Sequence, residues 1–526
     1  MESNNANPSA NKKQPHVGKN HKKLNVAEQI ISEVLDSEAI LFHDQHSEPY
    51  IAHYGNGSKI LKLTSKEFAT WIAYYYWKKE QKRVPRDADK EVIQTLSAYA
   101  LFEGPCYQLD VRLAGNENEL WYDLVDGRAV KVTKDNWQIV DTPPILFRRP
   151  QQKLQVEPER DGELELLRAY INVASDDDWL LFLVYVISAF VPNFPHPILV
   201  LSGPQGAGKT TPMRVIKELV DPSVVQGMPL PDRIPEFVQL ADHHAFLFFD
   251  NLSNMPTKMS DALARAATGD SFSKRQLFTD SDDVVYRIQK TIAINGINQV
   301  ISKPDLLDRA ILIKLKRIAP EQRMPEADFW AAFKHDKAQL LGAIFDTLVK
   351  ALSIYPNVEM SEVPRMADFT KWGCAIAEAA GYGQQTFIDA YKDNINRQNE
   401  EAIEASPVAK AVIEFVKDQA EWHGSAEELL KALNRQFGMS SLSSSPLWPK
   451  APEWMSRRLN DVETNLNAVG IRIEFERTPD GRKITITNDS LEALEQEPED
   501  EQEEEPQNPQ QGMSFDDSKS GKTANS

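Results

Sequence analysis

The middle of the sequence reads Gly203-Pro204-Gln205-Gly206-Ala207-Gly208-Lys209-Thr210, which fits the pattern G-x-x-x-x-G-K-[ST]. The apolar run 197–202 before it predicts a buried strand, and residues 211–220 after it predict a helix. Glycines let backbone N–H groups fold around phosphate oxygens, and the start of a helix adds positive potential. The setting therefore predicts a site for a nucleoside triphosphate; the alternative is a chance glycine-rich turn.

Each residue of this loop has an expected role. Lys209 is expected to reach the β- and γ-phosphates of ATP, and the hydroxyl of Thr210 to bind Mg²⁺. The residues expected to contact the nucleotide are Gly203, Pro204, Gln205, Gly206, Ala207, Gly208, Lys209, Thr210 and Thr211.

A second acidic strand is expected to complete the metal site. Residues 245–250 form an apolar run that ends in Asp250, whose carboxylate would hold Mg²⁺ through its water shell. A buried strand ending in Asp is common by itself. The order of the two motifs favours the functional interpretation.

Two further residues are candidates for the hydrolysis step. Residues 291–294 predict a third strand, and the amide of Asn295 at its end can orient a water beside the γ-phosphate; the alternative is an ordinary turn residue. Arg309 follows in the segment 305–309 and could stabilise the transition state at a neighbouring subunit's γ-phosphate. The alternative is a surface arginine paired with Asp305 or Asp308.

The motif order resembles the superfamily-3 helicase core of the AAA+ class, of the poxvirus and phage primase-helicase type. The segments 250–253, 260–263, 267–269, 295–297, 365–369 and 448–449 resemble ATP-binding proteins of bacterial mobile elements. Across residues 40–488 the resemblance implies an α/β fold: a P-loop, AAA+-type parallel-sheet ATPase core with an N-terminal α+β domain and a C-terminal helical, winged-helix region. It also implies a homo-hexameric ring with ATP at subunit interfaces and a central DNA channel. Arg309 as the finger acting in trans, and Asn295 as the first sensor, are carried over from it.

The chain departs from that pattern at two places. Asn251 stands where most AAA+ proteins have the Glu that activates water, and an amide cannot accept a proton at neutral pH. Residues 271–290 are expected to form the channel hairpin, but its expected tip, 279–283, is acidic. DNA contacts are then expected from Lys274, Arg275 and Arg287 on the arms, or from Arg457, Arg458 and Arg472 near the C-terminus.

Composition limits the class of protein. The net charge is −19, and residues 491–526 hold eleven acidic and two basic side chains, so that much of the charge lies in a tail expected to be disordered. Two distant cysteines, Cys106 and Cys374, exclude a disulfide scaffold and are typical of the reducing cytoplasm. The longest apolar run, 179–191, is too short for a membrane span and predicts a buried helix, so that no membrane association is expected.

Seven segments are expected along the chain. They are a disordered basic segment (1–23), an α+β domain (24–150), a helical linker (151–195), the P-loop ATPase domain (196–320), a helical region (321–405), a winged-helix-like domain (406–488) and a disordered acidic tail (489–526). The last globular segment rests on predicted helices at 408–422, 426–437 and 454–469, followed by a hairpin around 479–481.

Three other features have two interpretations each. A predicted helix that Ser65 caps carries the aromatic residues Trp71, Tyr74, Tyr75, Tyr76 and Trp77, which favours core packing over base stacking. The pair His243-His244 is expected on a strand, where neighbouring side chains point to opposite faces, which argues against metal binding. The pair Arg148-Arg149 is either a phosphate contact or a solvated face.

These features favour an ATP-driven DNA helicase or translocase of a phage, plasmid or integrated element, with ATP, Mg²⁺ and single-stranded DNA as ligands. The alternative is a nucleotide-gated switch or loader for a replication or anti-phage defence complex, which Asn251 and the acidic hairpin tip favour. The acidic tail would then recruit a basic partner. A small-molecule or nucleoside kinase is a weaker third interpretation.

Overall fold

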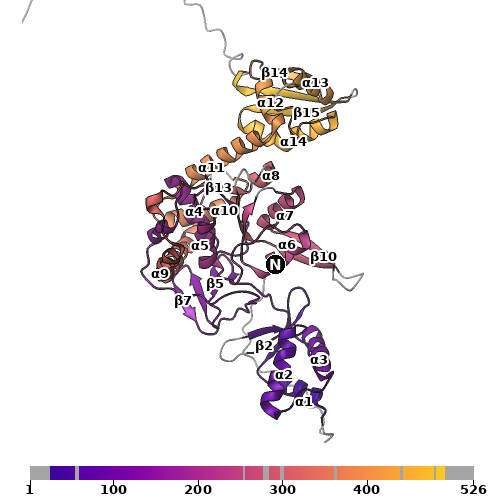
Figure 1. Ribbon diagram of the computed structural model, residues 1–526, viewed down its shortest axis with the longest axis vertical. Helices are drawn as coiled ribbons and strands as arrows, with labels where there is room; N and C mark the ends of the chain where they lie inside the picture. The colour runs from indigo at the N-terminus through magenta and orange to yellow at the C-terminus, as the bar shows by residue number, and fades with distance from the viewer. Residues whose placement is uncertain are drawn as a thin grey trace, which may run out of the picture.

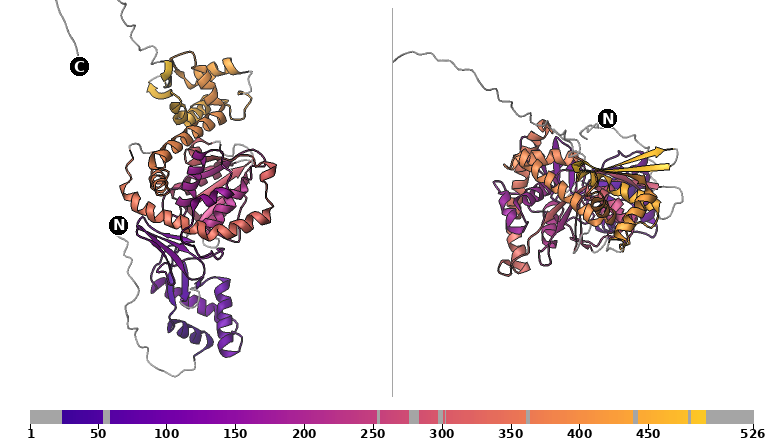
Figure 2. Two further views of the ribbon diagram at one scale, coloured as in Figure 1. Left: turned by 90° about the vertical axis from the view of Figure 1, so that its left-hand side faces the viewer. Right: turned by 90° about the horizontal axis from the view of Figure 1, so that it is seen from above.

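The computed structural model describes residues 24–53, 59–252, 255–275, 283–296, 301, 303–360, 364–438, 442–478 and 481–491. Three parts follow one another along the longest axis: an N-terminal part, a central body and a C-terminal part (Figure 1). Figure 2 shows the same succession from a second side. The expectations for residues 1–23, for the hairpin tip and for most of the acidic tail lie outside the described residues.

The N-terminal part packs three helices against a three-stranded antiparallel sheet of order β1-β2-β3. Capping residues start two of its helices. Asn25 forms a capping box with Glu28 at the start of α1. The Ser65 hydroxyl accepts a hydrogen bond from Phe68 N at the start of α2, which confirms the cap that the sequence predicted. The elements are α1 (Val26–Leu35), β1 (Ile40–His43), β2 (Pro49–His53), β3 (Lys59–Lys62), α2 (Lys66–Glu80) and α3 (Ala88–Phe102).

A second antiparallel sheet follows, with the order β4-β5-β6-β7. Its inner face belongs to the same hydrophobic core as the central body, to which Tyr122 and Trp137 contribute. The Tyr122 hydroxyl also donates to Leu219 O at 2.8 Å, and Trp137 Nε1 donates to Asp346 Oδ1 at 2.7 Å. Through these contacts the sheet, which lies before residue 150, packs against helices α5 and α9, which lie after it. The strands are β4 (Leu113–Gly115), β5 (Glu119–Asp123), β6 (Ala129–Thr133) and β7 (Trp137–Val140).

A four-stranded sheet of order β13-β8-β12-β9 forms the centre of the molecule, and all three strand pairs are parallel. Helices cover it, so that its strands are near-continuous apolar runs. This confirms a mixed α/β body on a parallel sheet. Sequence analysis missed one strand, β13, which forms an edge. The strands are β8 (Ile198–Ser202), β9 (Phe246–Leu252), β12 (Thr291–Gly296) and β13 (Ala310–Lys314).

The helices of the central body surround this sheet. Every residue of α4 from Asp178 to Ser188 is buried, which confirms the buried helix that the apolar run predicted. The helices are η1 (Leu164–Tyr170), α4 (Asp176–Ser188), α5 (Thr210–Val220), α6 (Ile234–His243), α7 (Thr257–Thr268), α8 (Pro304–Leu307), η2 (Pro320–Gln322), α9 (Glu326–Ile354), η3 (Tyr355–Asn357), α10 (Ala367–Ala379) and α11 (Gln384–Ala405).

Among the described residues, one helical segment, Glu326–Asn357, is long and apolar enough to cross a membrane. It contains α9, which packs against α10, η1 and β6, and 56% of its most apolar window is buried inside the protein. Helix α9 is therefore a core helix of the central body.

A hairpin projects from the central body beside α6 and α7 (Figure 1). It consists of β10 (Asp270–Arg275) and β11 (Asp283–Ile288), paired antiparallel from Asp270↔Ile288 to Arg275↔Asp283. This confirms that the segment 271–290 forms a hairpin. Residues 276–282, which include most of the expected tip, lie outside the described residues.

The C-terminal part has the element order helix, strand, two helices, two strands. Sequence analysis missed its first strand: the helix expected over 408–422 ends at Phe415, and β14 pairs with β16. Ser425 then starts the next helix with a capping box to Glu428. The elements are α12 (Pro407–Phe415), β14 (Glu421–Ser425), α13 (Ala426–Phe437), α14 (Pro452–Ala468), β15 (Ile471–Thr478) and β16 (Gly481–Asn488).

Candidate functional site

The parallel topology brings the carboxyl ends of β8, β9 and β12 to one edge of the central sheet. The loop 203–209 leaves β8 at this edge and leads directly into α5. Gly206 has φ 82° and Gly208 has φ 67°, which are left-handed conformations that favour glycine. The expected strand, loop and helix are therefore present in the expected order, and two of the motif's glycines are required by backbone conformation.

The lysine of the loop lies across the loop itself. Lys209 Nζ donates to Gly203 O at 2.9 Å and lies 3.5 Å from Pro204 O, and the side chain is half-buried. Arg323, which follows η2, is close to the loop at Gly206: a Cβ built on Gly206 would lie 3.7 Å from Arg323 Nη2. Sequence analysis missed Arg323, because no motif places a residue from beyond β13 beside the loop.

The two residues expected to hold Mg²⁺ meet at this edge. Thr210 Oγ1 donates to Asp250 Oδ1 at 3.0 Å, although the residues belong to α5 and β9. Among the described residues there is no cluster of three or more His, Cys, Asp or Glu side chains that could hold a metal by itself. One hydroxyl and one carboxylate fit Mg²⁺, which keeps several waters and takes further oxygens from phosphates.

Strand β9 is irregular at Asp250, where the sequence predicted only its end. Ile294 pairs with Phe249 and Gly296 with Leu252, so that Asp250 and Asn251 together lie opposite Asn295. Asn251 has φ 57°, a left-handed conformation that Asn tolerates better than most residues. Such a bulge redirects side chains beside it. The conformation gives a physical reason for Asn at this position.

Asn295 connects β12 to this bulge. Its Oδ1 accepts from Asn251 N at 2.8 Å, its Nδ2 lies 3.5 Å from Met213 Sδ, and the side chain is only 2% exposed. The structure therefore places Asn295 beside the Asp250–Asn251 bulge of β9. The amide fixes the backbone of β9, an interaction that sequence analysis missed.

Arg309 lies at the opposite edge of the sheet. It directly precedes β13, and its carbonyl accepts from Ile198 N at 2.7 Å, at the amino end of β8. The five residues of β8 separate this edge from the loop by about 16 Å. The structure does not bring Arg309 together with Lys209, Thr210 and Asp250 of the same chain.

The side chain of Arg309 is paired within its own segment. Its Nη1 contacts the Asp305 carboxylate and donates to Asp305 O at 2.7 Å. Arg365 joins this group, 2.7 Å from Asp305 Oδ1 and 2.6 Å from Asp308 Oδ2. Burial raises the pKa of Asp305, but the hydrogen bond from Arg309 and the two guanidinium charges outweigh it, so that the pKa is lowered. The pairing that the sequence offered as the alternative interpretation is present.

A buried ionic cluster anchors α5 beneath the loop. Lys217 and Asp221 are fully buried and 2.8 Å apart, and Lys217 Nζ also donates to Phe246 O at 2.7 Å. Arg112 and His244 lie 3.7 and 3.6 Å from the Asp221 carboxylate. Burial raises the pKa of Asp221, but the Lys217 charge and the hydrogen bond with His244 lower it further than burial raises it. Sequence analysis missed this cluster.

The expectation that His243 and His244 lie on a strand is wrong. His243 is the last residue of α6, and His244 precedes β9 and faces the ionic cluster. The pair Arg148-Arg149 is not a solvated face either: Arg148 pairs with Asp242 at 2.6 Å and Arg149 with Asp123 at 2.7 Å.

Two family models match the chain. The first describes the actinomycete integrative conjugative element replication protein and matches residues 164–401; the second describes the AICE RepA C-terminal domain and matches residues 408–504. Over these residues the chain is similar to replication proteins of mobile elements, which confirms the expected resemblance to proteins of bacterial mobile elements. No curated protein is similar to it at a significant level.

Solved structures overlap the chain loosely. The apo structure of the NrS-1 C-terminal region has a TM-score of 0.40 and 11% identity, and the overlap covers 87% of this chain and 98% of that one. A crystal structure of the JCV helicase with a bound small molecule has a TM-score of 0.21 and 11% identity, and the overlap covers 44% of this chain and 65% of that one. Overlaps at this level carry no argument about function.

Proposed function

We propose that this chain is an ATP-dependent DNA helicase or translocase of a mobile element, working as a ring of identical subunits in the cytoplasm. The observation that carries the proposal is the hydrogen bond between Thr210 and Asp250 at the mouth of the glycine-rich loop. Residues far apart in sequence meet there in the arrangement that a Mg²⁺–nucleotide site needs. The match to replication proteins of integrative conjugative elements supports a role in DNA replication.

Different residues in and around the loop would contact the phosphates and the Mg²⁺ ion of the nucleotide. Lys209 would exchange its bond to Gly203 O for contacts with the β- and γ-phosphates, and Arg323 would add a second positive charge near Gly206. Mg²⁺ would supply charge stabilisation at the phosphates when bound. Thr210 and Asp250 would hold it, with their mutual hydrogen bond giving way to contacts with the ion and its waters.

A second subunit would complete the site. Arg309 and Lys209 of one chain lie at opposite edges of the same sheet, so that an arginine finger at Arg309 can act only on a neighbour's nucleotide. Arg309 would have to leave Asp305 to do so. Because this ion pair is partly exposed, its loss costs about 1 kcal/mol or less, which a new charge contact at a phosphate can offset.

The second candidate function, a nucleotide-gated switch or loader with weak hydrolysis, rests on Asn251. Its side chain cannot take a proton from water, and its left-handed backbone would be less favourable for the Glu expected there. In this reading the ring assembles on ATP and presents a surface to a replication or defence partner. The acidic tail, which lies outside the described residues, would be one such surface.

ATP hydrolysis by the purified full chain tests the proposal. With Mg²⁺ and ATP, we expect single-stranded DNA to raise the rate strongly at low salt and less at moderate salt. Lys209→Ala should lower the rate at least about 100-fold, because it removes a charge from the transferring phosphate. The matched control is Lys350→Ala, at an exposed lysine near the end of α9. A rate that DNA does not change would favour the switch, and full activity in Lys209→Ala would exclude this site.

A further inference from the structure

Helix α2 presents part of its aromatic set to solvent. Tyr76 is buried in the N-terminal core, which agrees with the core interpretation, and Trp71 and Tyr75 are half-buried and stacked with ring centroids 5.2 Å apart. Tyr74 and Trp77, however, are 59% and 50% exposed. Core packing therefore does not account for these two side chains.

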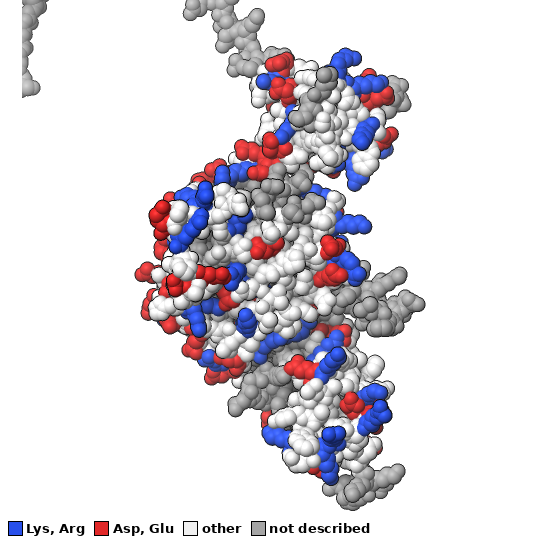
Figure 3. Space-filling model, in the orientation of Figure 1, with Lys and Arg blue, Asp and Glu red and all other residues white. Residues whose placement is uncertain are grey.

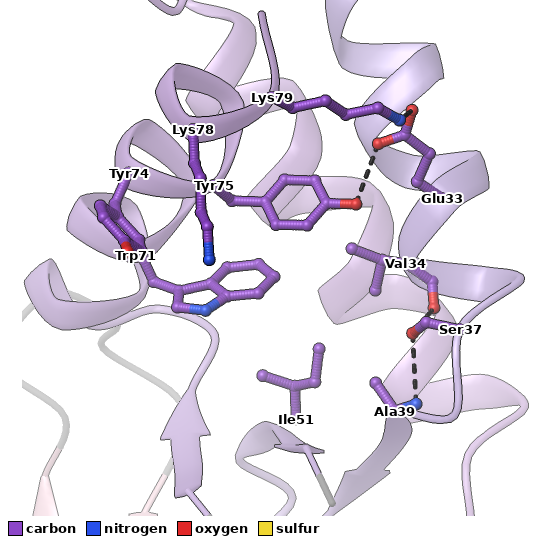
Figure 4. Close-up of a pocket in the computed structure, with 10 residues that line it drawn as sticks. All are labelled: Glu33, Val34, Ser37, Ala39, Ile51, Trp71, Tyr74, Tyr75, Lys78 and Lys79. Carbon is purple, nitrogen blue, oxygen red and sulfur yellow. Dashed lines mark hydrogen bonds and ion pairs between the residues drawn. The ribbon is translucent and has the colours of Figure 1, made fainter. Parts of the chain in front are cut away.

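Two hollows flank the ridge that Tyr74 and Trp77 form. The first has a volume of about 280 Å³ and lies between α2 and α1, lined by Trp71, Tyr74 and Lys78. Figure 4 shows Trp71 and Lys78 extending from α2 into this hollow, opposite Val34 and above Ile51. The second has a volume of about 520 Å³ on the other side of the ridge. It is lined by Ala69, Ala73, Trp77, Lys82, Arg83 and Arg86, among others.

Positive charge is concentrated at the same place. The segment 78–86 holds five basic residues and one acidic residue in a chain whose net charge is −19. Lys79 pairs with Glu33 and Lys82 lies 4.0 Å from Glu80, but Lys78, Arg83 and Arg86 are exposed and make no ion pair with any described residue. Lys and Arg side chains are prominent over this end of the molecule in Figure 3.

The stability of α2 does not require all of this charge. Lysines in the last turn of a helix offset its dipole, which accounts for Lys78 and Lys79. The helix ends at Glu80 and its C-cap, Gln81, has φ 55°, so that Arg83 and Arg86 lie beyond the reach of that effect. These two arginines are exposed cations near the exposed Trp77, and neither has an ion-pair partner among the described residues.

We propose that the α2 surface, defined by Tyr74, Trp77, Lys78, Lys82, Arg83 and Arg86, binds single-stranded DNA. Bases would stack on Tyr74 and Trp77, and the arginines and lysines would contact the backbone phosphates. Exposed aromatic side chains beside unpaired cations are the combination that sequence-tolerant single-strand binding uses. A duplex is disfavoured because its bases already stack on one another and offer no free face to the ridge. This site is separate from the nucleotide site and does not depend on ATP.

Binding of a labelled oligothymidine of about 12 nucleotides to the full chain, without nucleotide, tests the stacking contacts by fluorescence anisotropy. We expect Tyr74→Ala and Trp77→Ala each to raise the Kd about 10-fold, since loss of one stacked base costs ~1–3 kcal/mol. Tyr74→Phe should retain most of the affinity, because the ring stays. Phe102→Ala is the matched control: this side chain is 87% exposed on α3 of the same part of the chain.

The salt dependence of the same binding tests the phosphate contacts. Each phosphate contact to single-stranded DNA contributes about 0.7 to the slope of log K against log salt, so that the double variant Arg83→Ala, Arg86→Ala should lower the slope by about 1.4. Lys134→Ala, at another exposed lysine, should lower it far less. Circular dichroism of every variant checks that the N-terminal part remains folded.

The outcomes separate this inference from the proposed function. If Trp77→Ala and the double arginine variant bind oligothymidine as the unmodified chain does, the α2 surface is not a DNA site, whatever the ATPase shows. If a duplex of equal length binds as tightly and loses as much in Trp77→Ala, stacking on free bases is excluded. If the variants lose affinity while DNA fails to stimulate ATP hydrolysis, the α2 site stands and the motor does not.

Discussion

The two edges of the central sheet contrast sharply. At the carboxyl edge, loop 203–209 is half-exposed, and polar side chains of the elements beside it contact one another, as the bond between Thr210 of α5 and Asp250 of β9 shows. At the amino edge, Lys217 and Asp221 are buried as a pair, and Arg309 is neutralised within the chain by Asp305. The carboxyl edge is ready for a ligand within one chain, whereas Arg309 can become functional only when another chain approaches it.

The largest expected effect concerns mixed rings. Arg309→Ala and Lys209→Ala should each lower ATP hydrolysis, Arg309→Ala by about 10³-fold or more, because each removes one partner from every interface. When the two variants are mixed, some interfaces pair an intact Lys209 with an intact Arg309, and activity should return in part. Steady-state ATPase against mixing ratio measures this. If both variants stay inactive in every mixture, Lys209 of one subunit and Arg309 of its neighbour do not form a shared site.

The second effect concerns the buried anchor of α5. Asp221→Asn should lower the free energy of unfolding by about 3–5 kcal/mol, because it leaves Lys217 buried without its counter-charge. Thermal unfolding followed by circular dichroism measures the loss. The exposed pair of Lys431 and Glu427 offers a control, since Glu427→Gln removes an ion pair of similar length, 2.7 Å, that water screens, and the Tm should change far less. Equal shifts for both variants would mean that the buried cluster is no anchor.

A pH effect is expected at His196, which lies two residues before the first residue of β8, at the amino edge. Its ring nitrogens lie 2.8 and 3.1 Å from two backbone carbonyls, but burial dominates and lowers its pKa to about 4. Between pH 6.5 and 4 the unfolded chain therefore binds a proton that the folded chain does not. The free energy of unfolding is unaffected by this group above pH 6.5, and His196 lowers it by about 3 kcal/mol as the pH falls to 4.

Thermal unfolding across this pH range measures the His196 contribution. His196→Gln cannot titrate, so that its Tm should fall less steeply from pH 6.5 to 4 than that of the unmodified chain. If Tm falls equally with pH in the two proteins, burial does not lower the pKa of His196.

The smallest effect is expected from Asp305→Asn. It removes the carboxylate that neutralises Arg309 in the single chain, so that Arg309 becomes easier to transfer to a neighbour's phosphate. Since the pair is partly exposed, the gain in ATPase should not exceed about fivefold. Asp261→Asn, which frees Lys303 from a comparable pair on α7, is the control. A fall in activity for Asp305→Asn alone would mean that the carboxylate positions Arg309.

Local patterns predicted some residues well. The strand–loop–helix at 197–220, the buried helix α4 and the cap at Ser65 depend on neighbours in the sequence, and the structure has them. Patterns failed where distant segments decide the outcome. Residues 421–425 carry no strong strand signal and become β14 because β16 offers them a partner. The side chain of His244 is buried because it contacts Asp221 and Lys217 in the interior.

The sequence by itself determined that a phosphate-binding pattern opens a helix after a buried strand, and that Asp250 and Asn295 end apolar runs nearby. Tertiary structure alone decided that Asp250 meets Thr210, that a bulge turns Asn251 to a left-handed conformation, that Arg323 approaches the loop, and that Arg309 faces the far edge. The physical reason is that spacing and composition report local backbone preference, whereas strand order and sheet edge arise only when the whole core is buried together.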